Sequence, residues 1–372
     1  MSTPRPENEE VVRRDKLAKI VAAGLQPYPE RFTKTHTATV ALAQPEHAAI
    51  QVAGRLMSWR DMGKVTFGHL QDWTGKIQLV FKPDVLDPAD YQRLLEIIDL
   101  GDFIGVTGKI YTTQKGEKSV LVEHWTFLGK ALRPLPAKWH GLQDQEVKYR
   151  QRYLDLIANR ETMERFVFRS KLIQTLREFY WQEGFLEVET PPLLHTATGA
   201  AARPYHTHNH ALDIDVVLRI SHELPLKELI AGGFEKIFEI GKAFRNEGHD
   251  PSHLPEHTHL EHYCAYWNFE DNISFTERMF DHLFATLGLN KKVTIKDKEG
   301  IAQTVDFTTP WPRVDFLGLL KQDSGIDVME FSDADALRAA LIKQGIKFED
   351  MAAMSLPTLV DYLYKKVSRP KL

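Results

Sequence analysis

The stretch that most constrains the fold runs from Phe244 to Phe269, FRNEGHDPSHLPEHTHLEHYCAYWNF. Before it, Phe234 to Phe244 alternates large apolar residues with polar ones, which predicts a half-buried strand. A second strand is predicted from Thr258 to Trp267, and a polar loop rich in His and Pro separates the two. We therefore expect a long β-hairpin that carries chemically active side chains near its end.

Two side chains of this hairpin indicate its chemistry. Arg245 carries a planar, always-charged guanidinium that suits a phosphate group. Glu261 shares one face of the second strand with Tyr263 and Ala265, because side chains repeat every two residues along a strand. One arm is therefore predicted to bind phosphate, and the other to place an acid in a pocket.

The order of these residues is specific. FRNEG followed by H.PE.T..E.Y.AY resembles motif 2 of the class II aminoacyl-tRNA synthetases, in the form found in bacterial lysyl-tRNA synthetases. A surface hairpin with solvated charges is the alternative interpretation of any single residue, but the whole ordered string favours the family.

Composition limits the class of protein. A chain of 372 residues, 43% hydrophobic and 26% charged, can bury two cores. A net charge of -4 gives no overall basic field, so a polyanion would need a local patch. Cys264 is the single cysteine, and no apolar run reaches the roughly 18 residues that span a bilayer. The polar amino terminus lacks a signal-peptide core, so we expect a cytoplasmic protein that does not enter a membrane.

The first half of the chain predicts a small barrel. Residues 1–48 are expected to form an extension with a helix that has Leu17, Ile20 and Val21 on one face. Between Ile50 and Leu128, five β-rich runs occur, with a helical segment between the third and fourth. This is the layout of an OB-type Greek-key barrel, which we assign to residues 49–130.

The resemblance implies that this barrel binds the anticodon of tRNA(Lys). Phe67 would stack on an anticodon base, while Gln78 and Glu117 would read its edge. Stacking of this kind contributes roughly 1–3 kcal/mol per base. The alternative for Phe67 is an ordinary position in the barrel core.

Residues 131–372 are expected to form the catalytic domain. The string HGLQDQEVKYRQRYLDL resembles the domain junction of bacterial lysyl-tRNA synthetases. A helix predicted over Phe166 to Phe185, followed by FLEVETPPLL, resembles motif 1 and implies a homodimer. A helix with such a face could equally belong to a core.

The resemblance also implies a lysine pocket. Gly199 matches a glycine that contacts the substrate, although Thr198 stands where the family usually has another glycine. Glu223 and Glu261 would supply two carboxylates for the two ammonium groups of lysine, with Tyr263 lining the pocket. Buried ammonium groups require such partners.

For ATP, the resemblance assigns the catalytic roles to Arg245, on the α-phosphate, and Glu247, on the adenine amino group. Losing one such phosphate donor typically costs about 3–4 kcal/mol. His253 would contact the phosphates, and His257 stands in place of the usual adenine-stacking Phe. Leu254 replaces a usual Asn, so we expect weaker ATP binding.

No bound metal is predicted from the chain's own residues. Zinc at His249, His253 and His257 is the alternative, but these residues lie in a loop without fixed ligand geometry. Mg²⁺ is expected as a cofactor from the family, with most of its ligands in motif 3, a glycine-rich segment that ends in an Arg. That segment is not found among residues 289–372, which resemble a hairpin and the helical insertion that precedes it.

The predicted fold is α+β: an N-terminal OB barrel plus an incomplete class II synthetase antiparallel sheet with flanking helices. The predicted function is that of a lysine–tRNA ligase, present as a C-terminally truncated chain. A catalytically inactive, tRNA-binding paralogue is the alternative. Specificity for aspartate or asparagine is disfavoured, because Glu223 and Glu261 would repel an acidic substrate.

Overall fold

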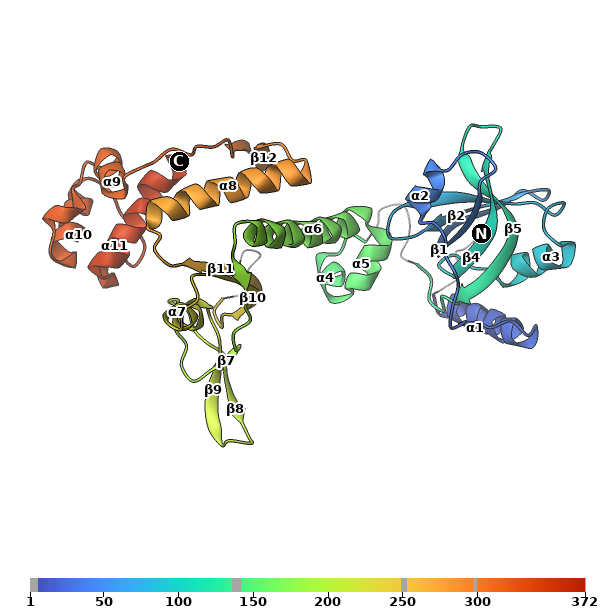
Figure 1. Cartoon of the computed structure of the whole chain (residues 1–372), viewed down its shortest axis with the longest axis horizontal. Helices are drawn as coiled ribbons and strands as arrows, with labels where there is room; N and C mark the ends of the chain where they lie inside the picture. Colours follow the sequence, from blue (N-terminus) through green and yellow to red (C-terminus); the bar gives the residue numbers. More distant parts are fainter. Residues whose placement is uncertain (1–5, 136–141, 249–252, 297–299, 372) are drawn as a thin grey trace. The chain divides into compact units, whose positions relative to one another are not determined.

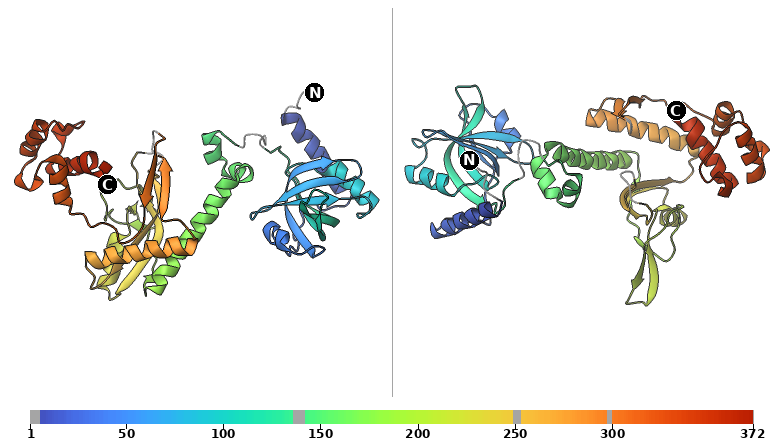
Figure 2. Two further views of the ribbon diagram at one scale, coloured as in Figure 1. Left: turned by 90° about the horizontal axis from the view of Figure 1, so that it is seen from above. Right: turned by 180° about the vertical axis from the view of Figure 1, so that it is seen from behind.

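A computed structural model describes residues 6–135, 142–248, 253–296 and 300–371 of the chain. The chain divides into two compact units, Met1–Ser170 and Lys171–Leu372. Figure 1 labels their helices and strands, and Figure 2 gives two further views. Within the described residues, no helix is both long enough and apolar enough to cross a bilayer.

The first unit contains a closed five-stranded barrel with the strand order β1-β2-β3-β5-β4. The pairings are antiparallel except for β3 with β5. Helix α3 lies between β3 and β4 in the chain, so the predicted OB layout is confirmed. The elements are β1 (Ala49–Asp61), β2 (Thr66–Gln71), β3 (Lys76–Phe81), α3 (Pro88–Ile97), β4 (Phe103–Thr112) and β5 (Lys118–Gly129).

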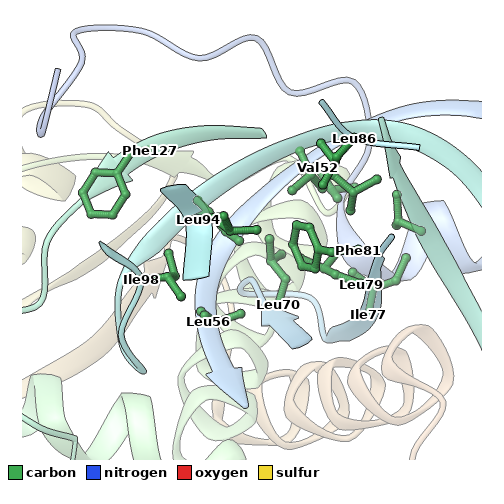
Figure 3. Packing of buried hydrophobic residues seen from close by; sticks show 14 of the residues in the cluster. Val52, Leu56, Leu70, Ile77, Leu79, Phe81, Leu86, Leu94, Ile98 and Phe127 are labelled. Carbon is green, nitrogen blue, oxygen red and sulfur yellow. The ribbon is translucent and has the colours of Figure 1, made fainter. Parts of the chain in front are cut away.

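Alternate side chains of the strands fill the barrel. Figure 3 shows this core, in which Leu56, Leu70 and Leu79 from three strands pack with Leu94 of α3. All four are fully buried. In β2, buried and half-buried residues alternate strictly, so Phe67 lies on the face opposite to core residue Leu70.

Helices α1 (Pro6–Ala22) and α2 (Ala38–Ala43) precede the barrel. Ile20 is fully buried in the barrel core cluster, as expected, but Val21 is 57% exposed, so its predicted place on that face is wrong. The buried face of α1 continues instead through Arg13, whose Nη1 donates hydrogen bonds to the carbonyl oxygens of Leu100 and Ala131, both at 2.9 Å. A long polar side chain can occupy such a face when its donors are satisfied.

Three helices follow the barrel. Helices α4 (Gln145–Arg150) and α5 (Arg152–Ala158) are separated at Gln151, whose φ of −117° and ψ of 59° interrupt the helical backbone. The long helix α6 (Arg160–Gln182) covers the helix expected at motif 1. Its Phe168 is 40% exposed whereas Phe179 is 4% exposed, so only the end of this helix is packed into a core.

Two small sheets form the centre of the second unit. In one, β10 pairs antiparallel with β11 and parallel with β6. The other has the order β7-β9-β8. The hairpin predicted around motif 2 is therefore present, as β10 and β11. The elements are β6 (Leu186–Glu187), β7 (Leu193–Leu194), β8 (His206–Asn209), β9 (Ile214–Leu218), α7 (Glu223–Ala231), β10 (Lys236–Phe244) and β11 (Glu256–Cys264).

Helix α8 (Phe269–Leu287) follows the hairpin and begins at a capping box formed by Asn268 and Asp271. Its Phe275 packs with Phe179, Tyr180, Phe185 and Phe238 in an aromatic core cluster. This cluster joins the end of α6 and helix α8 to the β10–β11 sheet.

The remaining elements match the predicted hairpin and three helices. They are β12 (Lys292–Lys296), β13 (Ala302–Asp306), α9 (Phe316–Ser324), α10 (Ala334–Lys343) and α11 (Leu356–Leu363), with short helical turns at Val328–Glu330, Met351–Ala353, Tyr364–Ser368 and Arg369–Lys371. Leu320, Leu337 and Leu359 give these helices their own buried cluster.

Asp72 ties the turn between β2 and β3 to the start of α2. Its carboxylate accepts hydrogen bonds from Lys34 Nζ at 2.9 Å, the Ala38 N–H at 2.9 Å and Thr74 Oγ1 at 2.6 Å. Burial alone would raise the pKa of Asp72, but the hydrogen bonds from Thr74, Lys34 and Ala38 lower it from 3.8 to about 2. The charged form is therefore the one that stabilises the barrel.

We expect Asp72→Asn to lower the free energy of unfolding of the barrel by about 2 kcal/mol at pH 7, from the size of the pKa shift. Because the folded pKa lies below the unfolded one, this stabilisation is complete above about pH 4 and disappears as the pH falls toward 2. Hydrogen exchange of barrel peptides, compared with the wild type at each pH, measures it. Asp84→Asn, at an exposed position of the same barrel, is the control. A pH-independent difference would contradict the prediction.

Candidate functional site

A buried ion pair forms the floor of the candidate site in the second unit. Arg219, just after β9, places its Nη1 2.6 Å from Glu239 Oε1, and the two side chains are 6% and 3% exposed. Glu239 Oε2 also accepts hydrogen bonds from the Thr190 hydroxyl at 2.7 Å and the Thr190 N–H at 3.2 Å. Arg219 Nε donates to the carbonyl oxygen of Lys242 at 2.8 Å. Segments far apart in sequence are thereby joined at one point.

The backbone of β10 passes very close to this floor. A Cβ atom at Gly241 would lie 2.4 Å from Arg219 Nη2 and 2.7 Å from His222 Nε2. Real Cβ contacts do not occur at such distances, so only glycine fits here.

Glu261 of β11 is a further acidic residue of the site, and hydrogen bonds hold its carboxylate in place. Its Oε1 accepts hydrogen bonds from the Ser221 hydroxyl at 2.6 Å and from the His222 N–H at 3.1 Å. Burial alone would raise the pKa of Glu261, but interactions with His222 and Ser221, and then the charge of His259, lower it from 4.5 to about 2. The carboxylate is therefore ionised at neutral pH and suited to binding a cation.

Gly199 brings its loop against the start of α7. It has a φ of +87°, which favours glycine, and an added Cβ would lie 2.7 Å from Glu223 Cβ and 2.8 Å from Ser221 Oγ. Glu223 Oε1 accepts a hydrogen bond from Lys227 Nζ at 2.5 Å. Thr198 Oγ1 is buried and has no hydrogen-bond partner in the described residues. The small-residue loop predicted from the sequence therefore does approach the acidic side chains.

Tyr263 lies close enough to the carboxylates of Glu223 and Glu261 for both charges to act on its phenol. Burial, followed by the negative charges of Glu223 and Glu261, raises the pKa of its phenol from 10.0 to about 12. The structure thus brings together the four residues predicted for lysine binding: Gly199, Glu223, Glu261 and Tyr263.

The structure brings only some of the residues predicted for ATP binding near the candidate site. Arg245 follows β10, and its Nε is buried without a hydrogen-bond partner in the described residues. His257 lies beside His259, with ring centroids 5.9 Å apart. Glu247 and His253 are exposed on either side of residues 249–252. His249, part of the zinc alternative, lies outside the described residues.

Sequence reasoning missed several residues of this site, including Arg219, Ser221, His222, Glu239 and His259. His259 could have been found, because it lies two residues before Glu261 and so shares its strand face. Burial lowers the pKa of His259, although the Glu261 charge opposes that shift. His222 gave no such signal, because only the packing of α7 against the hairpin places it here.

The residues that could share a metal ion in the described part of the chain are His222, His259 and Glu261. Two imidazoles and one carboxylate do not suit Mg²⁺, which prefers oxygen ligands in octahedral geometry. This cluster is therefore not a magnesium site, and most of the Mg²⁺ ligands implied by the resemblance are expected in motif 3.

A second candidate site is a groove of about 780 Å³ on the barrel of the first unit. Phe67, Gln78 and Glu117 all line it. Gln78 Nε2 donates to Glu117 Oε2 at 2.7 Å, and Gln78 Oε1 accepts from Ser119 Oγ at 2.8 Å. Phe67 is half-buried in the groove wall, not part of the barrel core.

The rest of the groove combines aromatic and basic side chains, the features of a surface for single-stranded nucleic acid. Lys82 lies over the ring of Tyr111, with Nζ 4.9 Å from the ring centroid. Trp59, Arg60 and Lys115 also line the groove. This local patch is the kind that a chain of net negative charge needs to hold a polyanion.

Comparison with known proteins supports the fold described for each of the two units. The family model for class II tRNA synthetases (D, K and N) matches residues 144–352, and that for the OB-fold nucleic acid binding domain matches residues 50–128. The lysine–tRNA ligase of Pelotomaculum thermopropionicum is 43% identical over 364 residues, covering 97% of this chain and 71% of that protein. The lysine–tRNA ligase of Dehalococcoides mccartyi strain 195 is 42% identical over 367 residues, covering 96% and 72%.

The barrel, the hairpin with its acidic pocket, and the matched family models define a class II aminoacyl-tRNA synthetase homologue. Members of this class use ATP and Mg²⁺. Within the class, the chain belongs to the lysine–tRNA ligase family.

We expect Glu239→Gln to destabilise the hairpin by about 3–5 kcal/mol, because it leaves the Arg219 charge buried without its counter-ion. Hydrogen exchange of the β10 amides measures the local opening free energy. Replacing both partners, Arg219→Met with Glu239→Leu, should recover part of the loss, since neither charge is then left unpaired. Glu235→Gln, at an exposed position before β10, is the control. Unchanged protection in Glu239→Gln would rule out a stabilising role for the pair.

Proposed function

We propose that the chain is a lysine–tRNA ligase, which activates lysine with ATP to lysyl-adenylate and transfers the lysyl group to tRNA(Lys). The observation that carries this proposal is that two acidic residues, Glu223 and Glu261, lie side by side. The Ser221 hydroxyl donates to Glu261 Oε1 at 2.6 Å and accepts from the Glu223 N–H at 3.1 Å, and both negative charges raise the pKa of Tyr263. Lysine has two ammonium groups, and two carboxylates can neutralise both.

The same pocket supports selection of lysine over other amino acids. A neutral side chain would leave the half-buried Glu261 carboxylate without a substrate cation to neutralise it, and an acidic one would be repelled. Gly199 allows the loop backbone to approach the bound amino acid, because no Cβ intervenes between the loop and Ser221 or Glu223. Tyr263 would line the pocket with its neutral phenol.

For the activation step, Arg245 would bind the α-phosphate during attack by the lysine carboxylate. Its buried, unpartnered Nε supports this role, because a buried guanidinium donor needs an acceptor. Glu247 would bind the adenine amino group, His253 the phosphates, and His257 would stack on adenine. Positioning and charge stabilisation then supply the catalysis.

The barrel groove is proposed to bind the anticodon, with Phe67 stacking on a base while Gln78 and Glu117 read its edge. Gln78 and Glu117 already hydrogen-bond to each other at 2.7 Å, which fixes their polar groups before RNA arrives. Preorganised groups of this kind reduce the entropy cost of binding.

We propose residues 49–130 as the anticodon-binding domain and 131–372 as the catalytic domain, preceded by the extension of residues 1–48. We also propose a homodimer through motif 1. Its support is two large apolar side chains near the end of α6 and just after it, Trp181 and Leu186, which are 53% and 44% exposed.

A catalytically inactive tRNA-binding protein is the second candidate function. It is favoured by one observation: the groove gathers all three predicted anticodon residues within the barrel unit, independently of the catalytic unit.

Lysine-dependent exchange of pyrophosphate into ATP tests the enzyme. Glu261→Gln should lower kcat/KM for lysine about 100-fold, because truncating one partner of a desolvated charge pair costs roughly 2–5 kcal/mol. Glu228→Gln, an exposed acid on α7, should leave the rate unchanged. The chain aligns with about 71–72% of its first two relatives, so the assay should include any longer product of the same reading frame. Exchange with neither form, together with retained tRNA binding, would favour the second candidate.

Phe67→Ala should weaken binding of tRNA(Lys) about 5- to 150-fold, which corresponds to the loss of one base stack of roughly 1–3 kcal/mol. The affinity must be measured at one fixed salt concentration, because phosphate contacts make it salt-dependent. Trp73→Ala is the matched control: Trp73 is an exposed aromatic residue of the same barrel, and it does not line the groove. Equal losses in both variants would argue against a specific stacking role for Phe67.

A further inference from the structure

Two imidazoles accompany Glu261 at the centre of the acidic pocket. His222, His259 and Glu261 each place one potential ligand atom within 4.8 Å of the others. His222 immediately precedes α7, while His259 and Glu261 are two residues apart on β11 and share a face. Two separate elements therefore bring potential ligand atoms close together.

His222 is an unusual residue in this setting. Its side chain is fully buried, and neither ring nitrogen has a hydrogen-bond partner in the described residues. The nearest carboxylate oxygens are Glu239 Oε1, 3.6 Å from Nε2, and Glu261 Oε1, 3.8 Å from Nδ1. Burying a polar group without a partner costs roughly 1–3 kcal/mol. A bound metal ion would supply the missing partner.

His259 shows the same feature. Its Nδ1 is also buried without a hydrogen bond, although it lies 3.2 Å from Glu261 Oε1. Two ligand atoms at about 2.0–2.1 Å from a tetrahedral zinc ion lie about 3.3 Å apart. Glu261 Oε1 lies 3.2 Å from His259 Nδ1 and 3.8 Å from His222 Nδ1. Both distances are close to the separation of two ligand atoms on one zinc ion.

We propose that His222, His259 and Glu261 bind one divalent transition-metal ion with the ligand preferences of zinc, and that this ion competes with lysine for the pocket. Two imidazoles and a carboxylate form a ligand set that leaves the fourth tetrahedral position open for water or an amine. The competition rests on the proposed function, because it requires that Glu261 also bind a lysine ammonium. One carboxylate cannot serve both cations fully.

The metal site is tested with the full chain and Zn²⁺, in competition with a chromophoric chelator, and with Co²⁺, whose visible spectrum reports tetrahedral coordination. We expect one tight equivalent per chain. His259→Gln and Glu261→Gln should each weaken Zn²⁺ binding at least about 100-fold, since loss of a direct ligand should cost no less than loss of an outer-shell partner. His259 is half-buried, so its replacement is less disruptive than that of fully buried His222.

His208→Gln is the matched control. The His208 ring lies 3.3 Å from Asp213 and 2.9 Å from Asp215, so it is another histidine close to two carboxylates. Its replacement should leave the tight equivalent intact. Circular dichroism of metal-free variants establishes that each one folds. Absence of a tight equivalent in the folded wild-type chain, or its loss in His208→Gln but not in His259→Gln, would overturn the proposed site.

Competition is measured by repeating the zinc titration with saturating lysine and, separately, with aspartate. Lysine should raise the apparent Kd for Zn²⁺ at least tenfold, and aspartate should raise it less. If lysine binds but leaves the zinc affinity unchanged, the shared-pocket part of the proposal is wrong. If the chain binds zinc but no lysine, both the proposed function and the competition fail, whereas the metal site is supported.

Discussion

The buried pair between Arg219 and Glu239 is the interaction on which the candidate site depends. Through it, the segment after β9, the segment at Thr190 and strand β10 share one hydrogen-bonded network. Because unpaired buried charges are costly, this network tolerates few alternative arrangements. Ser221 and His222 lie two and three residues after Arg219, so its position also constrains the groups that hold Glu261.

The pocket next to this ion pair keeps the carboxylate of Glu261 charged. Hydrogen bonds from Ser221 and the His222 backbone favour ionised Glu261, and the charge of Glu223 adds to the local negative potential. Such a pocket selects for positive charge, not for one chemical species. An ammonium group and a metal ion can both satisfy the same anion, which is why the proposed lysine site and the proposed zinc site can coincide.

Much of the fold could be predicted because its signals are local. The five strands and one helix of the barrel have period-two patterns broken by turn residues, and Asp90 to Leu100 marked α3 to within a few residues. Alternation also predicted that Glu261 and Tyr263 share a face. The helical pattern predicted for α1 was wrong at Val21, because that side chain lies in solvent while Arg13 occupies part of the buried face.

The sequence by itself determined the two folds, the hairpin and the residue types from which a phosphate-binding arm and an acidic pocket are predicted, since these follow from periodicity and from motifs within short stretches. Only the tertiary structure decided that Arg219 meets Glu239, that Gly199 packs on Ser221 and Glu223, and that His222 reaches His259 and Glu261. These contacts join residues about 20 to 40 positions apart, and no local pattern encodes such distances. They arise when chain segments pack so that buried charges and donors find partners.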